Sequence, residues 1–260
     1  MARFVFHGLI SLGMVSLFIR SLVAAPDVKP LLDQITTQSA TARMQAFKDL
    51  VAMGDGGVVA VAGQLTEPKV GEAVRDAGAR IALHGMAVQV SRPGAEKERA
   101  AFVKPVVRLL EGDRPAFFKR FLIEQLQIAG RDDAVPVLAV LLRDKDVAES
   151  ARQALEANRT DAAIAALRKA LPDSKGLLRV GIINSLGTRR DKAAVKALIA
   201  EAKDSTETVR CAALVALGKI GDPSAKPAIE AALNSPSAAV KRAATEAESL
   251  LSDRAKTEGK

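Results

Sequence analysis

The nonapeptide Val209-Arg-Cys-Ala-Ala-Leu-Val-Ala-Leu217 recurs in related form along the chain. Four copies start 31 residues apart, at positions 147, 178, 209 and 240. Three weaker copies lie upstream and begin at Ala42, Val74 and Phe118. In six of the seven copies the second residue is basic, with Ala148 as the exception. A fixed period of this length is typical of a repeat protein, in which each unit packs on its neighbours.

Each copy predicts one amphipathic helix and a second helix after it, because apolar and small residues recur at helical spacing. A residue that tolerates the left-handed conformation is expected to end the first helix: Gly54, Gly85, Gly130, Asn158, Gly187 or Gly218. Aspartates placed to cap the second helix follow in the later copies: Asp133, Asp161, Asp191 and Asp222. A further set marks the turn into the next repeat: Asp144, Asp173 and Asp204.

The pattern predicts an all-α fold, a right-handed α-α superhelix of about six helical hairpins. Two helices of this length cannot bury their own apolar stripes, so stacking on neighbours must supply the core. We expect the solenoid to span residues 26–252, with a polar capping helix from about 237 to 251 at its end. Residues 253–260 are predicted to form a disordered polar tail.

The segment Val209 to Leu233 resembles the short bacterial HEAT repeat, the type also called phycobilin-lyase-like. The resemblance is close in the last three copies and loose before Leu110. It implies a HEAT/armadillo-like solenoid in which Val209 and Arg210 open a first helix and Gly221-Asp222-Pro223 joins the pair. It also implies that the second helices line a concave face.

The N-terminus predicts export. Arg3 precedes an apolar run from Gly8 to Ile19, and small residues up to Ala25 offer a cleavage site after Ala24 or Ala25. We interpret residues 1–25 as a signal peptide, which predicts a periplasmic or secreted bacterial protein. The alternative is an uncleaved segment that anchors the chain to the membrane.

The composition argues against an enzyme or a cofactor. Cys211 is the single cysteine, and His84 is the single histidine after residue 25, so neither a zinc site nor a Cys-His pair is expected. We predict no catalytic, metal or cofactor site. His84 is expected near the end of a first helix, where its partial charge would suit the helix dipole. Cys211 is expected to be a small buried residue.

Two irregular regions stand out. The step from Val74 to Phe118 is longer than the repeat, and the surplus is assigned to a loop at residues 90–99. Such an insertion is either tolerated at the surface or used for binding. Further on, Phe117, Phe118 and Phe121 crowd one helix and are expected in the core.

The net charge is +8 for the whole chain and +6 without residues 1–25, which is a mild excess, and we interpret the charged residues as interleaved along the chain. We expect a non-enzymatic scaffold that binds a protein or peptide on its second helices. Candidate contacts are charged residues of those helices: Arg168, Lys169, Lys192, Lys196, Lys226 and Glu230. The resemblance leaves a lyase acting on a chromophore as one alternative. Nucleic-acid binding is the other, although the chain has no Trp or Tyr for base stacking.

Overall fold

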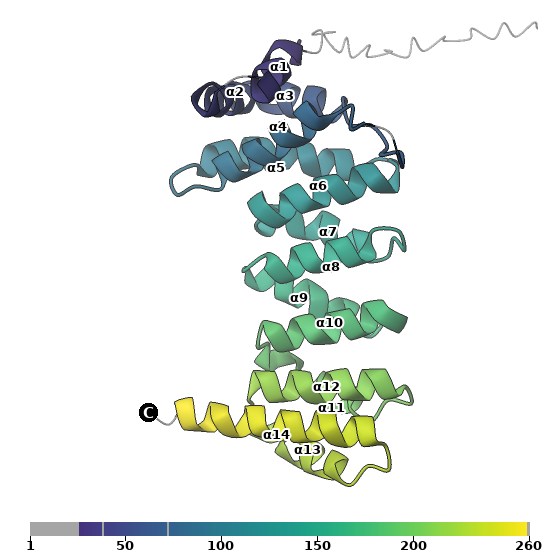
Figure 1. The fold of residues 1–260 in the computed structure, drawn as a ribbon. Helices are drawn as coiled ribbons and strands as arrows, with labels where there is room; N and C mark the ends of the chain where they lie inside the picture. Colours follow the sequence, from purple (N-terminus) through teal and green to yellow (C-terminus); the bar gives the residue numbers. More distant parts are fainter. Residues whose placement is uncertain (1–25, 38, 72, 259–260) are drawn as a thin grey trace, which may run out of the picture.

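The described part of the chain, residues 26–37, 39–71 and 73–258, is all helical in the computed structural model. A HEAT/armadillo-like solenoid runs from one end to the other (Figure 1). The helices that form one layer are α2 (Ala40–Ala52), α4 (Ala77–Val90), α6 (Ala116–Ala129), α8 (Ala148–Ala157), α10 (Gly176–Thr188), α12 (Glu207–Ile220) and α14 (Ala238–Glu258). Those that form the other are α3 (Gly54–Ala62), α5 (Glu96–Glu111), α7 (Val135–Leu141), α9 (Asp161–Ala170), α11 (Val195–Glu201) and α13 (Lys226–Leu233).

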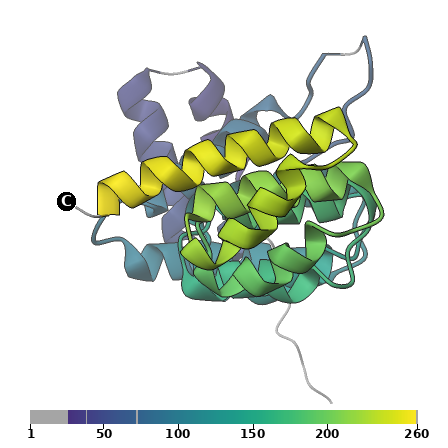
Figure 2. The same cartoon turned by 90° about the horizontal axis from the view of Figure 1, so that it is seen from below.

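Each helix of the first layer packs on the next one, from α2 through α14, and each from α4 to α14 also packs on the second helix of the preceding pair. Figures 1 and 2 show the resulting stack with α14 across its C-terminal end. The prediction of six hairpins and a capping helix is confirmed for the described residues. The additional helix α1 (Lys29–Thr37) was not predicted; it covers α2 and α4 at the N-terminal end.

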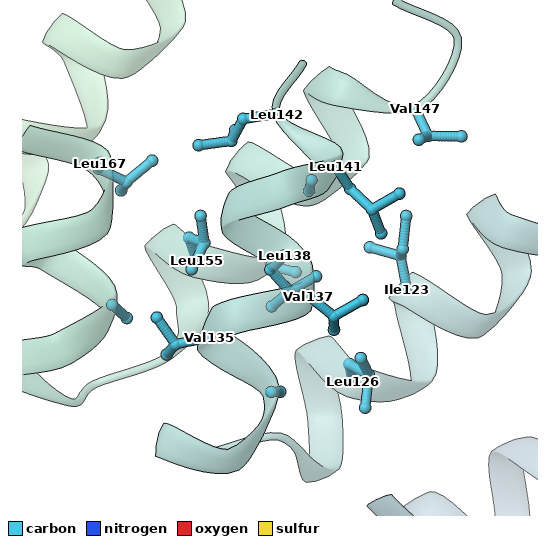
Figure 3. Packing of buried hydrophobic residues seen from close by; sticks show 14 of the residues in the cluster. Ile123, Leu126, Val135, Val137, Leu138, Leu141, Leu142, Val147, Leu155 and Leu167 are labelled. Carbon is cyan, nitrogen blue, oxygen red and sulfur yellow. The ribbon is translucent and has the colours of Figure 1, made fainter. Parts of the chain in front are cut away.

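The core lies between the two layers and continues from one pair to the next. Around α7, Figure 3 shows Ile123 of α6, Leu138 of α7, Leu155 of α8 and Leu167 of α9 packed together. Leu138, Leu155 and Leu167 are completely buried. Since burying one such side chain stabilises by about 2 kcal/mol, each pair depends on the adjacent pairs for its stability.

Most of the glycines expected to end first helices have another role. Gly85, Gly187 and Gly218 lie inside α4, α10 and α12 and are buried. Each allows a close approach between elements: a Cβ on Gly218 would lie 2.6 Å from the Cα of Ala247 on α14. The prediction that these three adopt the left-handed conformation is therefore wrong.

The left-handed conformation is found at other positions. Gly54, the first residue of α3, has φ +57°, as predicted, and Gly221 ends α12 with φ +79°. Gly130 and Asn158 do end α6 and α8, but their backbones are extended.

The aspartates after the first helices divide into caps and ion-pair partners. Asp222 accepts a hydrogen bond from the backbone N–H of Ser224, as predicted for a cap. At α9 the capping side chain is Thr160, which accepts from the N–H of Ala163, and Asp161 follows it in the helix. Asp133 pairs with Arg99 at 2.8 Å, and Asp191 makes no capping bond of its own.

The insertion lies elsewhere than predicted. Residues 91–95 form a short turn between α4 and α5, whereas the long loop, described at residues 63–71 and 73–76, lies between α3 and α4. Val74 therefore precedes α4 instead of opening it, and its side chain is exposed. The prediction failed because Val74-Arg75 imitates the Val-Arg start of the motif in a segment that is loop.

The phenylalanines of α6 follow the prediction only in part. Phe118 is buried, while Phe117 and Phe121 are half-buried against the core. The guanidinium of Arg80 lies over the ring of Phe121, 5.0 Å from its centroid. Such a cation–π contact explains how the Phe121 ring remains at the surface of the stack.

At the C-terminal end, α14 continues to Glu258, beyond the predicted end near 251. Residues 253–258, predicted as a disordered tail, are thus the last turns of a helix. Among the described residues no helix has both the length and the apolar character needed to span a bilayer. The apolar segment interpreted as a signal peptide, residues 1–25, lies outside the described residues.

Candidate binding surface of the second helices

The six predicted contact residues lie on three consecutive units of the second layer. Arg168 and Lys169 are in the last turn of α9, and Lys192 and Lys196 belong to the short 3₁₀ turn η2 (Lys192–Ala194) and to α11. Lys226 and Glu230 lie on α13. The structure therefore places all of them in one layer, but their interactions differ.

Arg168 holds two units together. Its guanidinium donates to both carboxylate oxygens of Asp191, at 2.6 and 3.0 Å. The hydrogen bond to Asp191 raises the pKa of Arg168. Because this bidentate pair joins the end of α9 to the start of η2, Arg168 is a structural link and is not free to contact a partner.

Lys226 and Glu230 interact with each other. They lie one turn apart on α13, with the Lys226 Nζ 3.7 Å from a Glu230 oxygen, and both side chains are more than half exposed. An exposed pair of this kind contributes at most about 0.5 kcal/mol and is readily exchanged for an external partner.

Lys169, Lys192 and Lys196 are exposed, and within the described residues no carboxylate pairs with them. Lys203, in the turn after α11, shares both properties and was not predicted. The Arg168–Asp191 pair brings the last turn of α9, with Lys169, against η2, with Lys192. We call Lys169, Lys192, Lys196 and Lys203 the lysine surface.

Two of the four acids between residues 159 and 203 are bound to arginines, and the other two, Asp161 and Asp173, are exposed, so the lysine surface keeps an excess of positive charge. Arg179 of α10 binds Glu201 at 2.7 Å and Asp204 at 3.3 Å, and Asp191 is bound to Arg168. Asp222 accepts from the hydroxyl and the N–H of Ser224, which hold its pKa low, and the charge of Lys192 adds to that effect. On α9 and α11 the remaining exposed carboxylate is Asp161, at a helix N-terminus that favours it.

Two arginines extend the positive charge along the hairpin turns. Arg159 and Arg190 are exposed, in the turns after α8 and α10, and neither has a carboxylate partner within the described residues. Burial and the charge of Arg159 lower the pKa of Arg189. Arg189 itself donates to backbone carbonyls at the end of α8, including those of Glu156 and Asn158. The repeat pattern predicts only a capping role for turn residues, so it does not identify Arg159 and Arg190 as binding residues.

Charge is grouped along the chain, and the interpretation that it is interleaved is wrong. Residues 159–203 contain 10 basic and 4 acidic residues. Apart from this segment and residues 1–25, the chain has 26 basic and 26 acidic residues and is neutral. A running count of charge along the sequence is sufficient to locate this segment.

The single histidine and the single cysteine of the described residues, His84 and Cys211, do not form a catalytic or metal site together. His84 is exposed in the middle of α4, six residues before its end, so the predicted role at a helix terminus is wrong. Cys211 is half-buried on α12, and burial raises the pKa of its thiol. Among the described residues no group of three or more His, Cys, Asp or Glu side chains is arranged to hold a metal ion.

The repeat period, the paired layers and the Gly-Asp-Pro turn of α12 and η3 (Pro223–Ala225) agree with the family profile described as HEAT repeats, which matches residues 164–248. These residues, about a third of the chain, are thus similar to HEAT repeats. The lysine surface lies within this HEAT segment, since all four of its residues fall between 164 and 248. No curated protein matches the chain.

Solved structures resemble the chain in fold. YibA from Escherichia coli is 17% identical, with a TM-score of 0.44, and the match covers 86% of this chain and 92% of that one. A designed armadillo repeat protein in complex with the peptide (KR)4 is 17% identical, with a TM-score of 0.40 and coverage of 87% and 100%.

The complex of CpcE and CpcF of phycocyanin lyase from Nostoc sp. PCC7120 is 16% identical, with a TM-score of 0.36 and coverage of 92% and 100%. Likeness at this level concerns the fold alone and says nothing about a partner or a reaction.

Proposed function

We propose that the protein is a non-enzymatic scaffold of the cell envelope that binds another protein or a peptide on its second helices. The exposed, positively charged face of α9 and α11 carries this proposal, because those lysines have no task in holding the fold. HEAT repeats typically bind proteins, and the HEAT segment includes this face.

The absence of an enzymatic role is part of the same proposal. His84 and Cys211 lie on α4 and α12, separated by three helices of their layer, so they cannot act together. The envelope location rests on the N-terminal sequence, in which a basic start, an apolar run and small residues form the pattern of a signal peptide. If that segment is retained, it would also attach the scaffold to the membrane.

A photo-crosslinking residue placed at Ala165 or Ala197, both exposed on the second layer, tests the proposal. We expect both positions to capture the same protein from an envelope extract of the native host. Asn184, exposed on α10 of the other layer, is the matched control position and should capture much less of it. Equal capture from all three positions would contradict binding on the second helices, and capture from a cytosolic extract alone would contradict the location.

A further inference from the structure

We propose that the lysine surface of α9 and α11 recognises an acidic segment of the partner protein. This inference rests on the proposed function and specifies the chemistry of the partner. The basic excess of the chain after residue 25 falls on residues 159–203, and in the folded structure seven of the ten basic residues of this segment are exposed.

The internal ion pairs explain why this face needs an external anion. The basic residues at helix joints already have partners: Arg168 binds Asp191, and Arg179 binds Glu201 and Asp204. The four lysines of the surface have none among the described residues. Lys192 and Lys196 lie one turn apart, where like charges repel each other, so carboxylates from a second molecule would relieve that repulsion and bring the two molecules together faster.

The surroundings of the lysines favour a protein segment over a membrane. Between Lys192 and Lys203 the other exposed side chains are alanines, Ala193, Ala197 and Ala200, which are too small to enter a bilayer. The large exposed apolar residues of the described chain lie on other elements, for instance Val140 on α7 and Leu177 on α10. Binding to lipid would thus depend on charge alone, which gives weak attachment.

Nucleic acid fits this face less well than an acidic peptide does. Single-stranded chains are usually held by aromatic side chains that stack on the bases. The chain contains no Trp or Tyr, and α9 and α11 contain no Phe. A flexible peptide rich in Asp or Glu needs only a row of ammonium groups, and Lys192 and Lys196 stand one turn apart, where both can reach it.

The test measures binding of a fluorescein-labelled oligoglutamate peptide to the full chain by fluorescence anisotropy at low ionic strength. The surface variant K169S/K192S/K196S/K203S should bind about tenfold or more weakly than the unchanged protein, because it loses four ammonium groups at once. The control variant K29S/K48S/K97S/K241S has the same net charge and removes exposed lysines from α1, α2, α5 and α14, outside the basic segment. It should keep affinity within about twofold, since screening makes distant charges count little.

Equal losses in the two variants would overturn the inference, because net charge alone would then explain binding. The inference would also be overturned if phosphatidylserine vesicles or single-stranded DNA bound more tightly than oligoglutamate and their binding was lost in the surface variant. Urea unfolding of both variants checks that they fold as the unchanged protein does. If the crosslinks from Ala165 and Ala197 succeed while oligoglutamate binding does not depend on the lysine surface, the scaffold function stands and the acidic partner is rejected.

Discussion

Two contacts between first helices, α12 with α14 and α8 with α10, involve the same two positions of the repeat. The first is a close backbone contact, and the second is a polar contact between side chains. In the first, Gly218 lies against Ala247, and a Cβ on the glycine would meet the Ala247 backbone at 2.6 Å. In the second, Glu156 replaces the glycine and Ser185 replaces the alanine, with a hydrogen bond of 2.7 Å between them. The α10–α12 contact, Gly187 on Ala216, follows the first type.

A buried polar network occupies the α8–α10 contact. Arg152 of α8 is a tenth exposed and donates to Glu149 at 2.7 Å, to Glu156 at 2.5 Å and to Ser185 at 2.5 Å. Burial alone would lower the pKa of Arg152, but the hydrogen bonds to Glu149 and Glu156 outweigh it, so its pKa is raised. Gly181 makes room, because a Cβ there would lie 2.8 Å from the Arg152 side chain. One repeat geometry therefore accepts either a close backbone contact or a fully paired polar cluster.

The largest effect is expected from Gly218→Val, which pushes a branched side chain into the α14 backbone. Overpacking against backbone atoms should lower the free energy of unfolding by about 3 kcal/mol in urea denaturation. Gly56→Ala in α3 is the control, since a Cβ at Gly56 meets only Pro26 at an ordinary 3.5 Å. That change should leave stability equal or raise it by about 0.5 kcal/mol through helix propensity. An unaffected Gly218→Val variant would show that α14 shifts freely and that the close contact contributes nothing.

The regular part of the stack could be predicted from the sequence because its determinant is periodic. From α8 to α14 the apolar stripe repeats every 31 residues, so helix positions follow from one another. Gly187 and Gly218 show the limit of this reasoning. A glycine near the end of a helical pattern can end the helix or permit close packing, and the sequence alone does not distinguish these uses.

The candidate site was predicted in part, for a related reason. Helical spacing identified Lys169, Lys192 and Lys196 as residues of one face. The same reasoning could not tell them from Arg168, because its partner Asp191 belongs to the next repeat and had been interpreted as a helix cap. An ion pair between two repeats depends on which side chains lie close together in the folded stack. A periodic sequence pattern does not contain that information.

Arg152→Leu should have the next largest effect. It removes the guanidinium that pairs with the partly buried Glu156, which then keeps only the Ser185 hydroxyl as a donor, at a cost of about 2 kcal/mol in the free energy of unfolding. The loss in the free energy of unfolding is not larger because the Glu149 side chain is more than half exposed and stays hydrated without Arg152.

The triple variant R152L/E156G/S185A installs the residues found at these positions in α12 and α14, and it should recover most of the loss. If the triple variant is no more stable than Arg152→Leu, the two kinds of contact are not interchangeable and the polar cluster has a structural role of its own.

The smallest effect on stability is expected from an ion pair between a first helix and the turn that follows its second helix. This ion pair is present in some repeats and missing in the repeat of α8. Lys119 on α6 binds Asp144 at 3.0 Å, and Arg179 reaches Asp204 across the same distance in sequence, whereas Ala148 cannot reach Asp173. The hydrogen bond from Lys119 lowers the pKa of Asp144, and the N–H of Asp146 adds to it.

Because the folded pKa of Asp144 lies below its unfolded value, the pair stabilises above the unfolded value of about 3.9 and loses its effect as pH falls through the folded pKa. Lys119→Met should therefore cost about 0.7 kcal/mol in urea at neutral pH, and the difference from the unchanged protein should vanish in acid. Lys241→Met, at the same repeat position on α14 but exposed, should cost nothing at either pH. A pH-independent loss in the Lys119 variant would mean that the aliphatic packing of the lysine, and not its charge, joins α6 to the following turn.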